Sequence, residues 1–272
     1  MVVKYYYPSW GSEHMPVEEF LRMVKSSGFD GAEIALDPDK DNLNRVRKLF
    51  ETYELDLLVQ HPFSKGCTPG EHLRDYSSKL ERLMAMQPVK VNCHTGKDYY
   101  QVDVNRLFIE DADRLSEKHQ VPVAHEIHRG RFTFCTALID NYLSAFPDLS
   151  LTADFSHWCV VSESLLEDQP GVLKRVVPHC THIHARVGYA QGPQVPHPEA
   201  PEYNRELEAH LRWWTMILDC HKRRGEPEMT VTCEFGPPPY LHTLPFSGDP
   251  VAAQHEMNMF IKKYLTQNLP LC

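Results

Sequence analysis

Short apolar runs alternate with longer amphipathic stretches along the whole chain, and this alternation is the main structural signal in the sequence. The short runs have the length and composition of strands, whereas the longer stretches repeat apolar residues at helical spacing. The predicted strands cover residues 2–7, 31–36, 55–62, 89–96, 121–128, 149–158, 181–188 and 228–236. The predicted helices cover residues 16–28, 42–54, 71–86, 104–120, 134–146, 163–177, 204–225 and 252–265.

The number of strand–helix units defines the expected architecture. Strands that alternate with helices indicate βαβ units and a parallel sheet. Eight such units in 272 residues fit a closed (β/α)₈ TIM barrel better than a doubly wound sheet, which usually has about five or six strands. No shift of composition and no linker divides the chain, so residues 1–272 are predicted to form a single α/β domain.

The composition is ordinary for a globular protein, with 42% hydrophobic and 24% charged residues. No apolar run approaches the roughly 20 residues of a membrane-spanning helix, and the first ten residues lack the pattern of a signal peptide. A cytoplasmic location without a membrane partner is therefore expected. The net charge of −9 and the absence of a basic block argue against binding to nucleic acid.

The eight cysteines are scattered along the chain and form no C-x-x-C pair. In a chain of this length without an export signal, they are expected to be reduced thiols. Cys93, Cys159 and Cys233 lie in or beside apolar runs, where cysteine acts as a small core residue. A disulfide framework is therefore not expected.

Polar residues gather at the ends of the predicted strands. They are Glu33, His61, His94, Glu126, His128, Asp154, His157, His184, Arg186 and Glu234. The active sites of TIM barrels lie at the C-terminal ends of the strands. This is therefore the end of the barrel at which a catalytic site is expected.

The alternation of side chains along a strand places many of these residues on one face. In the seventh strand His182, His184 and Arg186 share a face, and the apolar residues between them occupy the other. The corresponding residues of strands five, six and eight are Glu126, Asp154 and Glu234. His125 lies on the opposite face, toward the helices, where a structural histidine is expected.

Glu126, Asp154, His184 and Glu234 supply three carboxylates and one imidazole from four consecutive strands. Three carboxylates in one barrel mouth repel one another unless they are protonated or bind a cation. A divalent metal ion is therefore the predicted cofactor, with manganese first and magnesium, cobalt or zinc as alternatives. The competing explanation is a structural network in which each residue pairs with an arginine or a lysine.

The strand-end motifs HEIH, ADFSH, HIHAR and CEFG resemble those of the sugar phosphate isomerase/epimerase group, the xylose-isomerase-like TIM barrels. In ketose 3-epimerases of that group, a Glu, an Asp, a His and a Glu on successive strands bind one divalent ion, and the two glutamates exchange protons with the substrate. The resemblance implies that the metal ligands are Glu126, Asp154, His184 and Glu234. It also implies that Glu126 and Glu234 are catalytic and that His157 binds the substrate.

The resemblance does not extend to the residues that hold the substrate. In the epimerases, the metal-binding histidine is followed by a Gly-Glu pair and then by an arginine. In this chain Val187 occupies the glutamate position and Ala190 the arginine position. Phe132 stands where the epimerases tend to have a glutamate that contacts the substrate. The metal core therefore carries over, and the substrate clamp does not.

Several further polar and aromatic residues are predicted to contact the substrate. Together with His157 they are Arg186, His94, His61, Trp10 and Gln194. The guanidinium of Arg186 can form paired hydrogen bonds with an anionic group or with two hydroxyls. Ordinary packing is the alternative explanation for His61, His94 and Trp10.

Two other features near the strand ends have predicted supporting roles. His182 and His128 are expected to orient metal ligands by hydrogen bonding, with Asp154 or Glu234 as the partner of His182. The proline-containing loop 192–201 is expected to form a wall or lid over the pocket, and the alternative is a contact in a homodimer.

The predicted function is that of a divalent-metal-dependent isomerase or epimerase acting on a sugar or a keto-sugar derivative. A carboxylate removes a proton beside a metal-bound carbonyl to give an enediolate, and a second acid returns a proton. A lyase or dehydratase acting on a related sugar acid is the nearest alternative, because the same enediolate can expel a β-hydroxyl. The negative charge disfavours an endonuclease, and a catalytically silent sugar-binding barrel would not need both glutamates.

Overall fold

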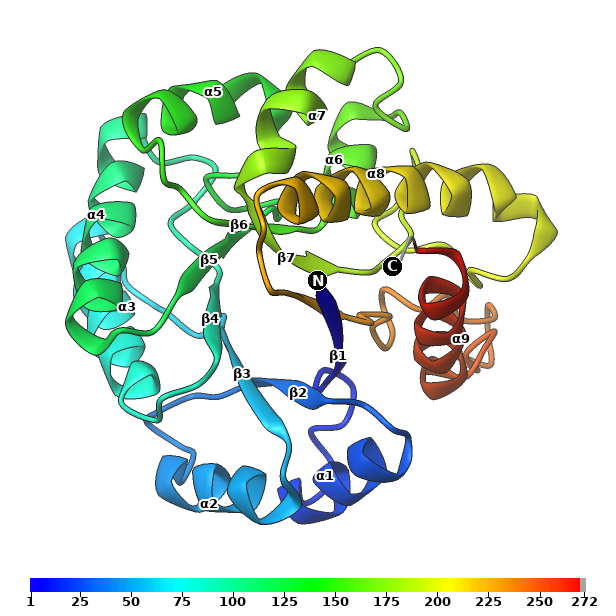
Figure 1. Ribbon diagram of the computed structural model, residues 1–272, viewed down its shortest axis with the longest axis horizontal. Coiled ribbons are helices and arrows are strands. Elements are labelled where there is room, and N and C mark those ends of the chain that lie inside the picture. The colour runs from blue at the N-terminus through cyan, green and yellow to red at the C-terminus, as the bar shows by residue number, and fades with distance from the viewer. Residues whose placement is uncertain (270–272) are drawn as a thin grey trace.

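The structure, a computed structural model, describes residues 1–269 and has the closed α/β barrel that the sequence predicts (Figure 1). Its eight strands are parallel and follow one another around the barrel in chain order, with β8 paired to β1. They are β1 (Val2–Pro8), β2 (Gly31–Ala35), β3 (Asp56–His61), β4 (Lys90–Cys93), β5 (Val123–Glu126), β6 (Leu151–Ala153), β7 (Cys180–His184) and β8 (Glu228–Thr232). Because all strands are parallel, their C-terminal ends meet at one mouth of the barrel.

Helices form a ring around the strands (Figure 1). Within the described residues they are α1 (Val17–Ser26), α2 (Leu43–Tyr53), α3 (Pro69–Met84), α4 (Val102–His119), α5 (Thr136–Ala145), α6 (Phe155–Ser162), α7 (Pro170–Val176), α8 (Asn204–Arg223) and α9 (Gln254–Asn268), with short 3₁₀ turns at Val177–His179 and Pro201–Tyr203. Local sequence signals begin several of them. Thr68 and Glu71 form a capping box at the start of α3, and Asn42 caps α2.

The largest departure from the predicted elements lies between β6 and β7. The strand predicted over residues 149–158 is reduced to β6, because the chain turns into α6 immediately after Asp154. The helix predicted over residues 163–177 is reduced to α7, because Glu163 and Leu166 adopt left-handed backbone angles, with φ of 49° and 57°. Such angles interrupt a right-handed helix.

The outward faces of the strands supply the core between the sheet and the helices. The apolar residues on the outward faces of β5, β6 and β8, and directly after them, are buried in this layer: Val123, Ile127, Leu151, Ala153, Val231 and Cys233. His125 also faces this layer, and its Nδ1 lies 2.7 Å from Oγ1 of Thr95. The side-chain alternation in the sequence is thus confirmed, and His125 has the structural position expected of it.

The seven cysteines that the structure describes are free thiols. Cys93, Cys159 and Cys233 are buried among apolar side chains, as predicted, and Cys272 lies outside the described residues. None of the helices within residues 1–269 is long and apolar enough to cross a membrane.

The charged residues at the N-terminal end of the strands pair with their neighbours. Nζ of Lys4 is 2.8 Å from Oδ2 of Asp56, which also accepts a hydrogen bond from the hydroxyl of Tyr6 at 3.2 Å. Lys90 is buried and donates to the carbonyl oxygen of Thr181. These contacts connect β1 with β3 and β4 with β7, so this end of the barrel is held together by side chains as well as by the sheet.

Candidate metal centre

Four side chains from the C-terminal ends of consecutive strands converge at the barrel mouth. Glu126 ends β5, Asp154 follows β6, His184 ends β7 and Glu234 follows β8. One ligand atom from each residue lies within 4.8 Å of the others, and all four residues are buried. The tertiary structure therefore brings together the four residues that the sequence predicts; they are called the donor set below.

His184 and Glu234 provide the test of whether a cation fits the donor set. Nδ1 of His184 and Oε2 of Glu234 are 2.8 Å apart and buried, yet neither makes a well-formed hydrogen bond within the described residues. Burial lowers the pKa of His184, but the charges of Glu234, Glu33 and Glu126 outweigh it and raise that pKa well above its usual value. Two buried ligand atoms that meet each other without a well-formed hydrogen bond, in an excess of negative charge, suit a divalent cation, so the residues fit the ion.

Glu126 is held in place by side chains from two other strands and a strand-end loop. Its Oε2 accepts hydrogen bonds from Asn92 at 2.7 Å, His94 at 3.0 Å and Gln60 at 3.3 Å. Burial raises the pKa of Glu126, but its interactions with His94 and His184, including the hydrogen bond from His94, bring it well below its usual value. Glu126 is therefore an ionised carboxylate.

His94 is oriented by an arginine from the loop that follows β5. Nη2 of Arg131 lies 3.3 Å from Nδ1 of His94, and a guanidinium can only donate hydrogen bonds. Nδ1 of His94 is therefore the acceptor, and the proton on its Nε2 points to Oε2 of Glu126. His94 acts at this site as a hydrogen-bond donor to a member of the donor set.

Arg186 is paired with a member of the donor set. Its Nη2 bonds to Oδ2 of Asp154 and lies 3.6 Å from Oε2 of Glu234, while its Nε is 3.2 Å from Oγ of Ser156. Burial raises the pKa of Asp154 to about 6 despite the charge of Arg186. The carboxylate–arginine pairing considered as an alternative to metal binding is thus present at Asp154.

Aromatic rings pack around the guanidinium of Arg186. Its central carbon is 5.6 Å from the ring centroid of Trp10 and 4.9 Å from that of Tyr240. The ring of Trp10 in turn lies close to the backbone at Gly236, where an added β-carbon would come within 2.1 Å of it. The glycine of the CEFG motif is therefore required by this close approach.

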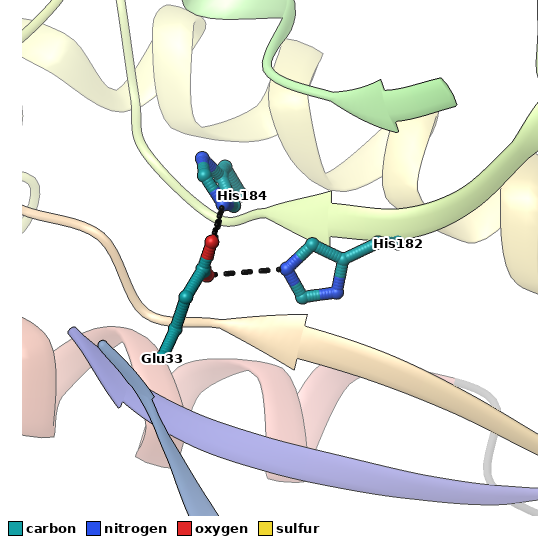
Figure 2. Close-up of side chains that lie close together, drawn as sticks. All are labelled: Glu33, His182 and His184. Atoms are coloured by element: carbon teal, nitrogen blue, oxygen red, sulfur yellow. Dashed lines mark hydrogen bonds and ion pairs between the residues drawn. The ribbon is translucent and has the colours of Figure 1, made fainter. Parts of the chain in front are cut away.

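Glu33 on β2 belongs to the site although it is absent from the predicted ligand set. Its carboxylate contacts Nε2 of His182 at 3.3 Å and Nε2 of His184 at 2.9 Å (Figure 2). Burial raises the pKa of Glu33, but the charge of His184 and hydrogen bonds from both histidines bring it below its usual value. The partner of His182 is thus Glu33, rather than Asp154 or Glu234. A single acidic residue in the apolar run 31–36 is the sequence signal for this role.

A cavity of about 310 Å³ opens beside the donor set. Both glutamates of the donor set line it, together with the aromatic side chains of Trp10, Phe63 and Tyr240. Three of the predicted substrate contacts, Trp10, His94 and Arg186, also lie in this lining. The cavity therefore gives a small molecule access to the donor set.

Three of the predicted substrate contacts do not line the cavity, namely His61, Gln194 and His157. His61 is fully buried, and its Nε2 is 3.1 Å from the carbonyl oxygen of Tyr76. The side-chain amide of Gln194 bonds to both the N–H and the carbonyl of Gly236, at 2.7 and 3.2 Å. His61 thus packs in the interior, and Gln194 fastens the proline-containing loop to the segment after β8.

His128 and His157 lie side by side near the cavity. Their ring centroids are 4.0 Å apart, and His128 is also 4.6 Å from the ring of His94. His128 lines the cavity, whereas His157 lies behind it and accepts a hydrogen bond from Arg186 at 3.0 Å. Burial lowers the pKa of both histidines well below the usual value, so both rings are neutral.

No protein-family model matches the chain, and no curated protein matches it. Solved structures do match. D-allulose 3-epimerase from Methylomonas sp. aligns with a TM-score of 0.68 at 12% identity, over 98% of each chain. 3-Keto-D-glucoside 4-epimerase from E. coli aligns at 0.63 and 13%, over 97% of this chain and 99% of the other. A family 2 AP endonuclease from Brucella melitensis aligns at 0.61 and 15%, over 86% and 93%.

These likenesses concern the fold. The chain shares the TIM-barrel fold of these proteins. Two of the three matched proteins are epimerases and the third is an endonuclease, so the fold alone does not select a reaction.

Proposed function

We propose that the protein is a divalent-metal-dependent isomerase or epimerase acting on a sugar or a keto-sugar derivative. The observation that carries the proposal is the double position of Glu126 and Glu234. Both belong to the donor set, and both line the 310 Å³ cavity. Each carboxylate could therefore contact both a bound ion and a substrate. Two such groups can act as the base and the acid in a proton transfer beside a carbonyl.

The ion would be held by Glu126, Asp154, His184 and Glu234. A divalent ion bound there would polarise a carbonyl and an adjacent hydroxyl of the substrate and acidify the neighbouring C–H. Manganese is the first expectation for this carboxylate-rich set, with magnesium, cobalt and zinc as alternatives.

Glu126 has the properties of the group that removes the proton. Asn92, His94 and Gln60 all donate to its Oε2 and stabilise the ionised form. Its Oε1 lies 3.8 Å from Nδ1 of His184 and is free of these three donors. A carboxylate kept ionised in this way accepts a proton without first having to lose one.

Glu234 is the matching group that returns a proton. Its Oε2 has no well-formed hydrogen bond within the described residues and faces both His184 and Arg186. Return of the proton to the same carbon from the other face inverts that carbon, which is epimerisation. Return to the neighbouring carbon interconverts an aldose and a ketose.

The remaining cavity residues suit a polyhydroxylated ligand. Trp10, Phe63 and Tyr240 offer ring faces and edges, and Gln60, His94 and His128 offer polar groups. Arg186 already pairs with Asp154, so the cavity does not require an anionic group on the substrate. This observation favours a neutral keto-sugar over the anionic ligand that Arg186 suggests in the sequence.

The test is a metal analysis of the purified protein, followed by a screen of ketoses and keto-sugar acids for deuterium uptake from D₂O. The proposal expects a divalent ion close to one per chain and deuterium in recovered sugar of unchanged elemental composition. Glu126→Gln and Glu234→Gln should abolish the uptake. Glu228→Gln, the same change at the opposite end of β8 where Glu228 pairs with Lys4, is the matched control.

Other outcomes of the same screen would replace the proposal. A product that has lost water indicates a dehydratase, because the leaving hydroxyl changes the mass. Binding of a sugar without any deuterium uptake indicates a silent sugar-binding barrel. Protein that retains no divalent ion and binds none on titration would remove the basis of the proposed chemistry.

A further inference from the structure

Glu33 is surrounded almost entirely by hydrogen-bond donors. Its carboxylate contacts Nε2 of His184 at 3.0 and 2.9 Å and Nε2 of His182 at 3.3 Å (Figure 2). It also accepts from Oγ1 of Thr232 at 2.5 Å and from Nδ2 of Asn92 at 2.9 Å. Glu33 is only 3% exposed and does not line the cavity. A buried carboxylate with this number of donors is built to be ionised and fixed in place, and not to meet substrate.

The second histidine at Glu33 is itself held by β8. Nδ1 of His182 lies 2.8 Å from Oγ1 of Thr230 and 3.0 Å from the carbonyl oxygen of the same residue, and its Nε2 faces Glu33. Thr232 donates its hydroxyl to Glu33 from the other side. Groups from β7 and β8 therefore position the carboxylate before any ligand enters.

This fixed carboxylate determines which nitrogen of His184 is available. Nε2 of His184 must carry a proton in order to donate to Glu33. In a neutral imidazole the lone pair is then on Nδ1, and Nδ1 is the atom that faces Glu234 at 2.8 Å and Glu126 at 3.8 Å. Carboxylates that bind the far nitrogen of a metal-ligating histidine commonly orient the ring and strengthen its bond to the ion.

We infer that Glu33 is the positioning residue of the metal centre, which holds His184 in the Nε2–H tautomer with Nδ1 directed into the donor set. The inference rests on the proposed metal-dependent function, because it concerns the orientation and the protonated nitrogen of one proposed metal ligand, His184. Asn92 extends the role, since its Nδ2 donates to both Glu33 and Glu126 and its Oδ1 accepts from Thr152. One amide thereby links the positioning carboxylate to the proposed base.

Glu33→Gln is the variant that tests the inference. It keeps the size of the side chain but replaces one acceptor oxygen with an N–H₂ group that would face the N–H or O–H donors around it. His184 relieves this conflict by moving its proton to Nδ1, which removes the lone pair from the donor set. Loss of such a carboxylate typically weakens metal binding by about 10–100-fold.

The measurement is the Kd of Mn²⁺ in metal-stripped protein, taken by titration calorimetry on samples shown to be folded by circular dichroism. The expected result is a rise of about 10–100-fold in Glu33→Gln and no change in Glu228→Gln. An unchanged Kd in Glu33→Gln, with the wild type binding tightly, would overturn the inference and leave the proposed function standing. A wild type that binds no Mn²⁺ would overturn both.

A second measurement needs no variant and covers the case in which Glu33→Gln fails to fold. ¹⁵N NMR of histidine-labelled wild-type protein loaded with diamagnetic Zn²⁺ reports which nitrogen of His184 carries the proton. The inference requires a protonated Nε2 and a metal-bound Nδ1. A protonated Nδ1, or Zn²⁺ on Nε2, would overturn it, whereas a purely structural role of Glu33 in the barrel predicts no fixed choice between the two.

Discussion

The two ends of the barrel bury charge in different ways. At the N-terminal end Lys4 pairs with Asp56 at 2.8 Å, and the buried Lys90 is bonded to a neutral carbonyl oxygen. At the C-terminal end the donor set and Glu33 place four carboxylates close together. Arg186 is the arginine that bonds directly to a member of the donor set, and histidines supply most of the remaining contacts.

The difference separates contacts that hold strands together from groups that suit the proposed chemistry. Contacts at the N-terminal end join strands to one another, so their loss should loosen the barrel and leave a reaction unaffected. Carboxylates at the C-terminal end repel one another until a cation arrives, so their loss should affect the reaction first. Each prediction below challenges this division, in order of decreasing expected effect.

The largest effect is expected from Glu126→Gln at the C-terminal end. The amide cannot take up the substrate proton, so solvent deuterium uptake should fall by about 10²–10⁴-fold, the usual contribution of a positioned base. Mass spectrometry of the recovered sugar measures this. The circular dichroism spectrum should remain that of a folded α/β protein. Full uptake in the variant would show that the proton moves elsewhere.

Removal of the metal ion is expected to lower stability, because the ion binds the folded donor set far better than the unfolded chain. At free metal near 100 times its Kd this linkage is worth about 2.7 kcal/mol. The melting temperature should therefore fall by roughly 5–10 °C on chelation, and Mn²⁺ should restore it. Glu234→Gln should weaken this response. A melting temperature indifferent to chelator, in protein shown beforehand to be loaded, would contradict the metal centre.

Lys90 at the opposite end should affect the pH dependence of stability. Burial lowers its pKa to about 8, against the charges of Glu228 and Glu33, which raise it. Below pH 8 Lys90 is charged in both the folded and the unfolded chain, so burial of the charge lowers the stability of the folded state. From about pH 8 to 10.4 only the unfolded chain keeps the proton, so stability rises with pH in this window.

The variant Lys90→Met removes this titration. Between pH 7 and pH 9 the free energy of unfolding of the wild type should gain about 1 kcal/mol relative to Lys90→Met. Urea denaturation at the two pH values measures the difference. Parallel stability curves for the two proteins would show that Lys90 stays charged despite its burial, and that this end of the barrel tolerates an unbalanced charge.

The smallest effect is expected from Asp56→Asn. The amide still accepts a hydrogen bond from Tyr6 but loses the ion pair with Lys4, whose side chain is 31% exposed and also contacts Glu228. A partly exposed pair of this kind is worth at most about 1 kcal/mol, or roughly 2–4 °C in melting temperature. Deuterium uptake should not change. A tenfold loss of uptake would mean that the two ends are coupled.

Much of the donor set could be predicted because each member ends a strand with a strong periodic pattern. Glu126, Asp154, His184 and Glu234 follow from the alternation within their own strands and from the rule that active sites lie at C-terminal strand ends. The boundaries of β6 were less predictable. The apolar run through Phe155 and Trp158 suits a strand as well as a buried helix, and α6 begins there.

The partners of these side chains could not be predicted in the same way. Arg186 shares a strand face with His184 in the sequence, which suggests a substrate contact, yet it bonds to Asp154. Gln60 and Asn92 are neutral amides that no pattern in the sequence marks as part of the site, although both donate to Glu126. Such pairings depend on how adjacent strands are staggered, and a single strand carries no information about its stagger.

The eightfold alternation of strands and helices and the polar character of the strand ends can be read from the sequence alone, because both follow from the periodicity of local backbone structure. That Glu33 faces His184, a residue 151 positions away in the chain, is a property of the folded barrel. Closure of the barrel brings β2 and β7 to opposite sides of one interior, and the register of every strand between them sets the heights at which their side chains meet. A contact that depends on so many registers arises only when the sheet has closed.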